Sequence, residues 1–312
     1  MLYEYAVEPD LASTWHDRKE GRYFLDSFGQ ERGRVLSRYP KHWTRLVWEA
    51  SRDLGEVGRK RMEEVLAQLS QAMVARGAVY DGTRTWLENA RAEHTRSPFR
   101  AVLVRAKTGA LRDAIAADAL ETDPLWAVPM AMAVPRKPAA LAAAISPMLR
   151  LASEMVFVDP HFTPTKRRYI HTMRAFLQAA FDERPGPDPT RVEIHHANDG
   201  VDAEYFEAEC KKQLHDIVPE GFCVRIVRWR QREGGERLHN RYILTDIGGV
   251  QFGIGLDAPD GEEGQMEDLN RLGREQRALR WAQYAGANPA FEPAGEVTVV
   301  GRGRRRQRSR TR

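Results

Sequence analysis

The residues best suited to chemistry lie close together in the last third of the sequence. His239, Arg241 and Asp246 follow the spacing H-x-R-x4-D, and the letters between Arg241 and Asp246 read YILT, which is typical of a buried strand. Because side chains alternate along a strand, His239 and Arg241 fall on the same face. An imidazole and a fixed positive charge can then meet one phosphate. The motif therefore predicts phosphodiester chemistry or phosphate binding.

Other cationic side chains could assist this motif. Arg228, Arg230 and Arg232 occupy alternate positions in FCVRIVRWRQR, so we expect their guanidinium groups to project from one side of a strand. Lys166 follows the end of an earlier expected strand, a position that lines the crevice of an open α/β sheet. We expect these four side chains to bind phosphate, with a solvated charged surface as the alternative.

Three further polar residues stand near the ends of expected strands. His161 and His195 are better explained as structural histidines than as site residues. Asp159 fits a helix cap as readily as a functional position.

Cysteine usage and hydropathy exclude several classes of protein. Cys210 and Cys223 have neither the spacing of metal ligands nor the density of a disulfide framework, so we expect no metal site, and nothing requires an organic cofactor. No apolar run approaches the roughly 18 to 20 residues that a membrane span needs. The first ten residues, MLYEYAVEPD, are acidic where a secretory signal would be basic and then apolar. We therefore expect a cytoplasmic protein.

The positive charge of the chain is concentrated at its end. Residues 302–312 contain seven arginines and no acid, so the formal net charge of +4 becomes −3 once this segment is set aside. Such a segment cannot bury itself, and we expect residues 296–312 to form a disordered arm that attracts phosphates. A tail that only aids solubility is the alternative.

Hydrophobic spacing predicts three regions. Residues 1–97 should be mostly helical, because WTRLVWEA and VGRKRMEEVLAQLSQAMVARG repeat apolar residues every three or four positions. Residues 98–295 alternate strand-like and helix-like segments, which predicts an α/β domain with a mainly parallel sheet and an antiparallel addition near its end. Within it we expect a strand at FRAVLV and a helix at LRDAIAADAL.

Residues 98–295 resemble the phospholipase D superfamily. The motif at 239–246 matches the family spacing H-x-[K/R]-x4-D, and EMVFVDPHF followed by a long helix is similar to the strand and helix that open a repeat in many members. The resemblance implies a phospholipase-D-like mixed, mainly parallel sheet flanked by helices, preceded here by the helical N-terminal region.

The resemblance also implies a metal-independent mechanism. His239 would attack phosphorus to form a phosphohistidine, Arg241 would take the place of the family lysine, and Asp246 would orient His239. A second histidine must protonate the leaving group, yet no other histidine of the chain has the motif spacing. The family solution is a twofold homodimer with the active site across the axis.

A second resemblance points away from catalysis. After the motif the family often carries Gly-Ser-x-Asn; Gly253 fits as a phosphate-binding position, but Ile254 and Leu256 occupy the polar positions. The ending GIGLD is also similar to the phospholipase-D-like C-terminal domain of microtubule-interacting-and-trafficking proteins, which binds lipid membranes.

These features leave three hypotheses. The first is a homodimeric phosphodiesterase, a nuclease rather than a lipase, acting in bacterial defence. The second is an inactive module that binds phosphate groups of nucleic acid or, less favoured, of membrane phospholipid, with residues 1–97 docking a protein partner. The third is a structural subunit of a larger assembly, with the aromatic-rich first 97 residues as its contact surface.

Overall fold

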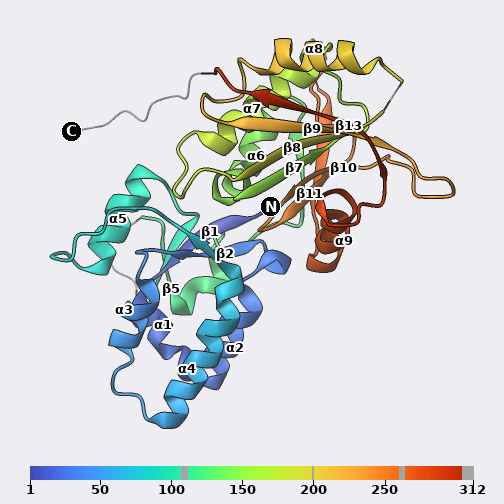
Figure 1. Ribbon diagram of the computed structural model, residues 1–312. Coiled ribbons are helices and arrows are strands. Elements are labelled where there is room, and N and C mark those ends of the chain that lie inside the picture. Colours follow the sequence, from blue (N-terminus) through green and yellow to red (C-terminus); the bar gives the residue numbers. More distant parts are fainter. Residues whose placement is uncertain (107–111, 199, 260–263, 304–312) are drawn as a thin grey trace. The chain divides into compact units, whose positions relative to one another are not determined.

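The chain forms two compact units (Figure 1). The computed structural model describes residues 1–106, 112–198, 200–259 and 264–303. The N-terminal unit contains residues 2–129 with 185–187, and the C-terminal unit contains residues 130–184 and 188–312 together with Met1.

The N-terminal unit is built on a parallel sheet, called sheet A. Its strands are β1 (Tyr3–Val7), β2 (Arg34–Arg38), β3 (Met73–Ala75), β4 (Ala101–Val104) and β5 (Ala114–Ala116). They lie in the order β3-β2-β1-β4-β5, and every neighbouring pair is parallel. A parallel sheet needs cover on both faces, which the helices of this unit supply.

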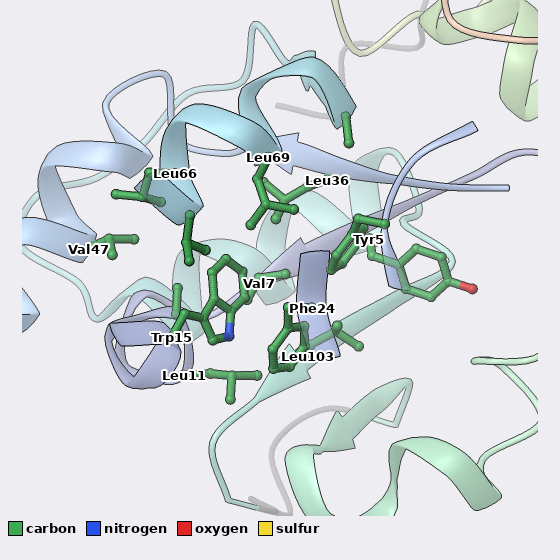
Figure 2. Packing of buried hydrophobic residues seen from close by; sticks show 14 of the residues in the cluster. Tyr5, Val7, Leu11, Trp15, Phe24, Leu36, Val47, Leu66, Leu69 and Leu103 are labelled. Atoms are coloured by element: carbon green, nitrogen blue, oxygen red, sulfur yellow. The ribbon is translucent and has the colours of Figure 1, made fainter. Parts of the chain in front are cut away.

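Helices bury both faces of sheet A. They are α1 (Pro9–Ala12), α2 (Arg18–Ser27), α3 (Trp43–Ala50), α4 (Glu56–Leu69) and α5 (Trp86–Arg96). On one face, Tyr5, Val7 and Leu103 pack with side chains from α1 to α4 and with Trp15 (Figure 2). On the other face, Val102 and Val104 belong to a cluster with residues of α5.

The N-terminal region is mostly helical, as predicted, but its helices cover a parallel sheet that was not predicted. The helix expected at 43–50 is present, whereas the helix expected over 57–77 spans 56–69 and is followed by β3, one of three strands among the helices. Those strands have three to five residues and are covered on both faces, so they carry no clear period-two pattern. The segment LRDAIAADAL, predicted helical, instead contains β5, because pairing with β4 outweighs the helix propensity of alanine. The division between the units falls at 129–130 rather than at 98.

The C-terminal unit is built on an eight-stranded mixed sheet, called sheet B. Its strands are β6 (Ala131–Pro135), β7 (Glu154–Val158), β8 (Arg191–Ala197), β9 (Cys223–Arg230), β10 (Arg241–Thr245), β11 (Gly249–Phe252), β12 (Met266–Arg271) and β13 (Glu292–Val300). The order is β13-β9-β8-β7-β10-β11-β12-β6. Only β7, β8 and β9 run parallel to one another; all other neighbouring pairs are antiparallel.

Four helices accompany sheet B: α6 (Pro138–Leu151), α7 (Arg167–Phe181), α8 (Ala203–Leu214) and α9 (Arg274–Ala285). Phe157 of β7 stacks on Phe176 of α7, whereas Val156 and Val158 share a cluster with Tyr284 of α9. Alternate residues of β7 thus face α7 and α9, so these helices cover opposite faces of the sheet. Within the described ranges, no helix is long and apolar enough to cross a membrane.

Sheet B differs from the predicted sheet in three ways. The sheet is mixed, as predicted, but it is not mainly parallel, because parallel pairing is confined to three strands. Strands β6, β12 and β13 were not predicted, because their short or irregular segments lack a strong alternating pattern. Residues 296–300, predicted to be disordered, belong to β13, which pairs with β9. The rest of that prediction, from 304 to 312, falls outside the described residues.

Candidate phosphate site

Several chain segments meet at one edge of sheet B. The parallel strands β7, β8 and β9 end there, and the antiparallel strand β10 begins there. In the pairing of β7 with β10, Tyr242 lies opposite Val158, so the next position brings Arg241 opposite Asp159. This carboxyl edge is where ligands bind in open α/β sheets.

His239 and Arg241 lie on the α7 side of the sheet at this edge. Tyr242 and Leu244 face the α9 cluster, so the odd-numbered positions of β10 face the opposite way. His239, two residues before the strand, is exposed, and Arg241 is half-buried. The strand therefore brings these two predicted residues to the same region.

Arg241 carries a buried donor that has no acceptor. Its Nε is inaccessible to water and has no hydrogen-bond partner among the residues that the structure describes. Its positive charge acts on the nearby carboxyl of Asp159, which is buried. Burial raises the pKa of Asp159, while N–H groups of Leu256 and His161 and the charge of Arg241 oppose that rise.

The backbone of the GIGLD loop, residues 253–257, is held by two buried carboxylates. The N–H of Leu256 donates to Oδ2 of Asp159 at 2.8 Å. The N–H of Ile254 donates to Oε1 of Glu267 at 2.7 Å, and that of Gly255 to Oε2 at 3.3 Å. The consecutive N–H groups that could bind a phosphate at this loop are thus already bound by protein carboxylates.

Gly255 allows this close packing. A Cβ at that position would lie 2.6 Å from Oδ1 of Asp257 and 3.4 Å from Oδ2 of Asp159. Only glycine leaves room for both carboxylates beside the loop. The second glycine of GIGLD therefore has a packing role that its sequence position did not reveal.

Two arginines neutralise the acidic groups beneath the loop. Nη2 of Arg136 donates to Oδ1 of Asp257 at 2.7 Å and to its backbone oxygen at 2.9 Å. Nε of Arg136 lies 3.6 Å from Oε2 of Glu267, and Nε of Arg168 lies 3.0 Å from Oδ2 of Asp257. Burial raises the pKa of Glu267, whereas the loop N–H groups and Arg136 lower it.

Sequence reasoning missed this ionic cluster of Arg136, Arg168, Asp257 and Glu267. Its members are spread over more than 100 positions and share no spacing. In β12 the letters MEDLNR do not alternate apolar and polar residues, so only the structure shows that Glu267 takes an inward position. A carboxylate on the buried face of a strand needs a partner, and so points to a buried polar cluster.

Asp246 lies at the other end of β10 from His239. Its Oδ1 accepts hydrogen bonds from the N–H groups of Ser153 at 2.9 Å and Glu154 at 3.2 Å, where β7 begins. Seven residues of extended chain span roughly 20 Å, so Asp246 cannot orient the His239 of its own chain. The predicted contact between these two residues is absent, and Asp246 instead fastens β10 to β7.

The other predicted phosphate ligands do not form one row. Arg228 is buried, and its Nη2 donates to Oδ1 of Asn198 at 2.7 Å, since Phe206 of α8 covers this part of β9. Arg230 is exposed at the end of β9. Arg232 is exposed as well, with Nη2 donating to the backbone oxygen of Phe291 at 3.2 Å.

Lys166 and Gly253 both lie at the carboxyl edge. Lys166 is exposed immediately before α7. Gly253 follows β11, and its N–H donates to the backbone oxygen of Asp268 at 3.1 Å rather than remaining open. Lys166 can therefore reach a ligand, whereas the Gly253 N–H is already used.

His195 is a buried member of β8. Its Nδ1 accepts from Nε1 of Trp229 at 3.0 Å, which leaves the proton on Nε2 to donate to Glu193 at 2.9 Å. Burial lowers the pKa of His195, in keeping with a neutral ring. Both ring nitrogens are satisfied, as a structural histidine requires. His161 is exposed after β7, and Asp159 binds its N–H at 2.9 Å, so Asp159 caps a turn and not a helix.

The described residues contain no group of three or more His, Cys, Asp or Glu side chains arranged to hold a metal ion. No protein-family model matches the sequence, and no curated protein matches it significantly. What the chain does must be inferred from its residues.

Proposed function

We propose that the carboxyl edge of sheet B binds phosphate groups of nucleic acid without cleaving the phosphodiester bond. The observation that carries this proposal is the buried Nε of Arg241, which has no acceptor among the described residues. A donor that has lost water and gained no hydrogen bond is costly. Arg241 is only half-buried, so a phosphate that pairs with its guanidinium group would offset this cost. In this proposal the C-terminal unit is a diverged phospholipase-D-like domain.

The charge around Arg241 supports an anionic ligand. Lys166 and His239 are exposed at the same edge, and Arg230 is exposed at the end of β9. The acids Asp257 and Glu267 already pair with Arg136, so they do not cancel these cations. Seven arginines in the last eleven residues favour a polyanion such as nucleic acid over a single phospholipid headgroup.

The same geometry favours binding without catalysis. The loop N–H groups that could stabilise a transferring phosphoryl group are bound by Glu267 and Asp159. Asp246 binds the start of β7, so His239 lacks the carboxylate partner that the family mechanism assigns to it. A nucleophilic histidine without an orienting partner is poorly prepared for attack.

The proposal is tested by oligonucleotide binding. Fluorescence anisotropy with single- and double-stranded DNA and RNA in EDTA, over a range of KCl concentrations, would compare the wild-type chain with Arg241→Gln. For the variant we expect roughly tenfold weaker binding. We also expect the slope of log K against log salt to decrease by the amount that corresponds to about one phosphate contact. Arg52→Gln, which changes an exposed arginine of the N-terminal unit, is the matched control and should bind like wild type.

Three outcomes would contradict the proposal. Failure to bind any oligonucleotide at low salt would exclude a nucleic-acid site. Equal loss of affinity in Arg241→Gln and Arg52→Gln would assign binding to net charge and not to this edge. Binding of anionic phospholipid vesicles but not of oligonucleotides, with the same dependence on Arg241, would make the ligand a lipid headgroup.

A second candidate, a phosphodiesterase acting as a twofold dimer, is favoured by the exposure of His239 on the same side of β10 as Arg241. A second copy could bring its own His239 to this edge as the general acid. Incubating the same oligonucleotides in EDTA separates the candidates. Cleavage that disappears in His239→Ala would support the enzyme; intact oligonucleotide bound to a folded protein would support the binding module.

A further inference from the structure

The edge strand β13 has one protected half and one open half. Among the residues that the structure describes, it pairs with β9 on one side only, so its other side is an edge of sheet B. Its first half carries Pro293, a register shift before Glu296, and Gly295 at φ 122°. Proline, bulges and charge are the usual devices that stop another strand from adding to an edge. The second half, Val297–Val300, has none of them.

The open half presents unpaired backbone groups. The N–H of Gly301 donates to the backbone oxygen of Phe222 at 2.9 Å. This hydrogen bond shows which alternate residues of β13 direct their N–H and C=O groups toward β9. Because such bonds alternate along an antiparallel pair, the N–H and C=O groups of Thr298 and Val300 point away from β9. Both residues are exposed, Val300 by 67%, which is unusual for a valine in a strand.

A basic cavity of about 450 Å³ adjoins this open half. Its walls come from the end of α8 and from β13, which lie beside each other in Figure 1. Basic side chains and the open strand residues line it: Lys211, Lys212, His215, Arg302, Thr298, Val299 and Val300. No acid belongs to this lining.

The cations of this cavity can turn to a ligand at little cost. Lys211 pairs with Glu207 and Lys212 with Glu209 along α8, and both lysines are exposed. Nε2 of His215 lies 3.2 Å from Oδ1 of Asp216. Exposed pairs of this kind contribute about 0–1 kcal/mol, so a new anion can compete for the lysines. Arg302 is exposed, and its N–H donates to the backbone oxygen of His215.

We infer that the open half of β13 and the basic cavity form a docking surface for an extended acidic segment of a partner protein. The segment adds to the edge as a further strand and bonds to the outward N–H and C=O groups of Thr298 and Val300. Alternate side chains of an added strand face the same way, so acidic residues at every second position meet Lys211 and Lys212.

The chemistry of the surface favours a peptide over other occupants. Outward N–H and C=O groups in alternation match another backbone, whereas a nucleic-acid phosphate offers no donor for the carbonyls. Val299 and Val300 add apolar surface to the cavity. A second copy of this chain would bring two basic edges together, which like charges oppose.

The test uses the full chain and a fluorescent synthetic peptide of about eight residues that alternates valine and glutamate. Anisotropy would compare wild type with Val300→Pro, which removes an outward N–H without touching a bond to β9. We expect affinity to fall about tenfold. A double variant with Lys211→Glu and Lys212→Glu reverses two charges at the end of α8. It should weaken binding of the peptide by a similar factor.

Controls make the test specific. Lys60→Glu, an exposed change on α4, should bind like wild type, and a peptide with lysine in place of glutamate should not bind. Unchanged affinity in Val300→Pro, or equal binding of the lysine peptide, would overturn the inference. Two further results would also overturn it. The first is that an oligonucleotide displaces the peptide and binds equally well to wild type and to Val300→Pro. The second is that the wild-type chain sediments as a dimer and that Val300→Pro makes this dimer dissociate.

Discussion

The protonation state of the buried carboxylate of Glu193 is set by neighbouring side chains. It accepts hydrogen bonds from His195, Arg191 and Arg225 on the inner strands β8 and β9. Burial by itself would raise its pKa, but the hydrogen bonds from His195 and Arg191 and the charge of Arg191 lower it to about 2. The ionised carboxylate is therefore favoured by folding, and its protonation is disfavoured.

The sign of the resulting pH dependence follows from this lowered pKa. The stabilisation by Glu193 is fully present above its unfolded pKa, near 4.5, and is lost as the pH falls from there toward about 2. We expect Glu193→Gln to be destabilised at pH 7 and the difference from wild type to shrink at pH 3. Urea unfolding at both pH values measures this. A difference that grows on acidification would show that the carboxylate is not held in its ionised form.

At the scale of elements, the residues at the two ends of strand β10 have different roles. Its beginning carries His239 and Arg241 at the carboxyl edge, and its end carries Asp246, which binds the first N–H groups of β7. Partial burial raises the pKa of Asp246, and those N–H groups oppose the rise. The first two residues of the H-x-R-x4-D motif thus belong to the candidate phosphate site, whereas its aspartate holds β10 to the start of β7.

Because the two ends of β10 differ in role, a change at Asp246 should affect stability but not oligonucleotide binding. Asp246→Ala leaves two N–H groups without their acceptor, but Asp246 is exposed and water can replace it, so the free energy of unfolding should fall by only about 0.5–1.5 kcal/mol. The affinity of the folded variant for oligonucleotides should match that of wild type, because Asp246 lies roughly 20 Å from His239. Urea unfolding and anisotropy on the same sample check both statements. A variant with normal stability and lost binding would place Asp246 in the phosphate site after all.

At the scale of the whole molecule, charge is divided between nearly balanced residues 1–303 and an arginine-rich end. Residues 304–312 hold six arginines, and the earlier residues carry far less net charge than pI 9.1 suggests. In the proposed function this segment adds further phosphate contacts. Each contact contributes about 0.9 to the slope of log K against log salt on double-stranded DNA.

Removing residues 304–312 should therefore flatten the salt dependence of DNA binding and weaken binding at low salt. Arg241→Gln in the shortened chain should still lower affinity, because the edge site stays intact. A chain with the six arginines changed to lysine keeps the charge and is the control. An unchanged slope after truncation would mean that the terminal arginines make no phosphate contact.

Some features of the protein follow from the sequence itself. Long periodic helices such as 56–69 and 167–181, and apolar strands such as 154–158 and 241–245, were predicted where the structure has them. Local spacing suffices because each element forms from neighbouring residues. The shared face of His239 and Arg241 was also predictable, since alternation is a local property of a strand.

Other features were decided only by tertiary structure. Sheet A was missed because its short strands gain their stability from parallel partners far along the chain. Asp159, Glu267 and the GIGLD loop meet through strand order in sheet B, which no spacing encodes. Likewise, Arg228 is buried and Arg230 is exposed because α8 covers one and not the other. Contacts between distant segments fix burial, and burial decides which charges remain available to a ligand.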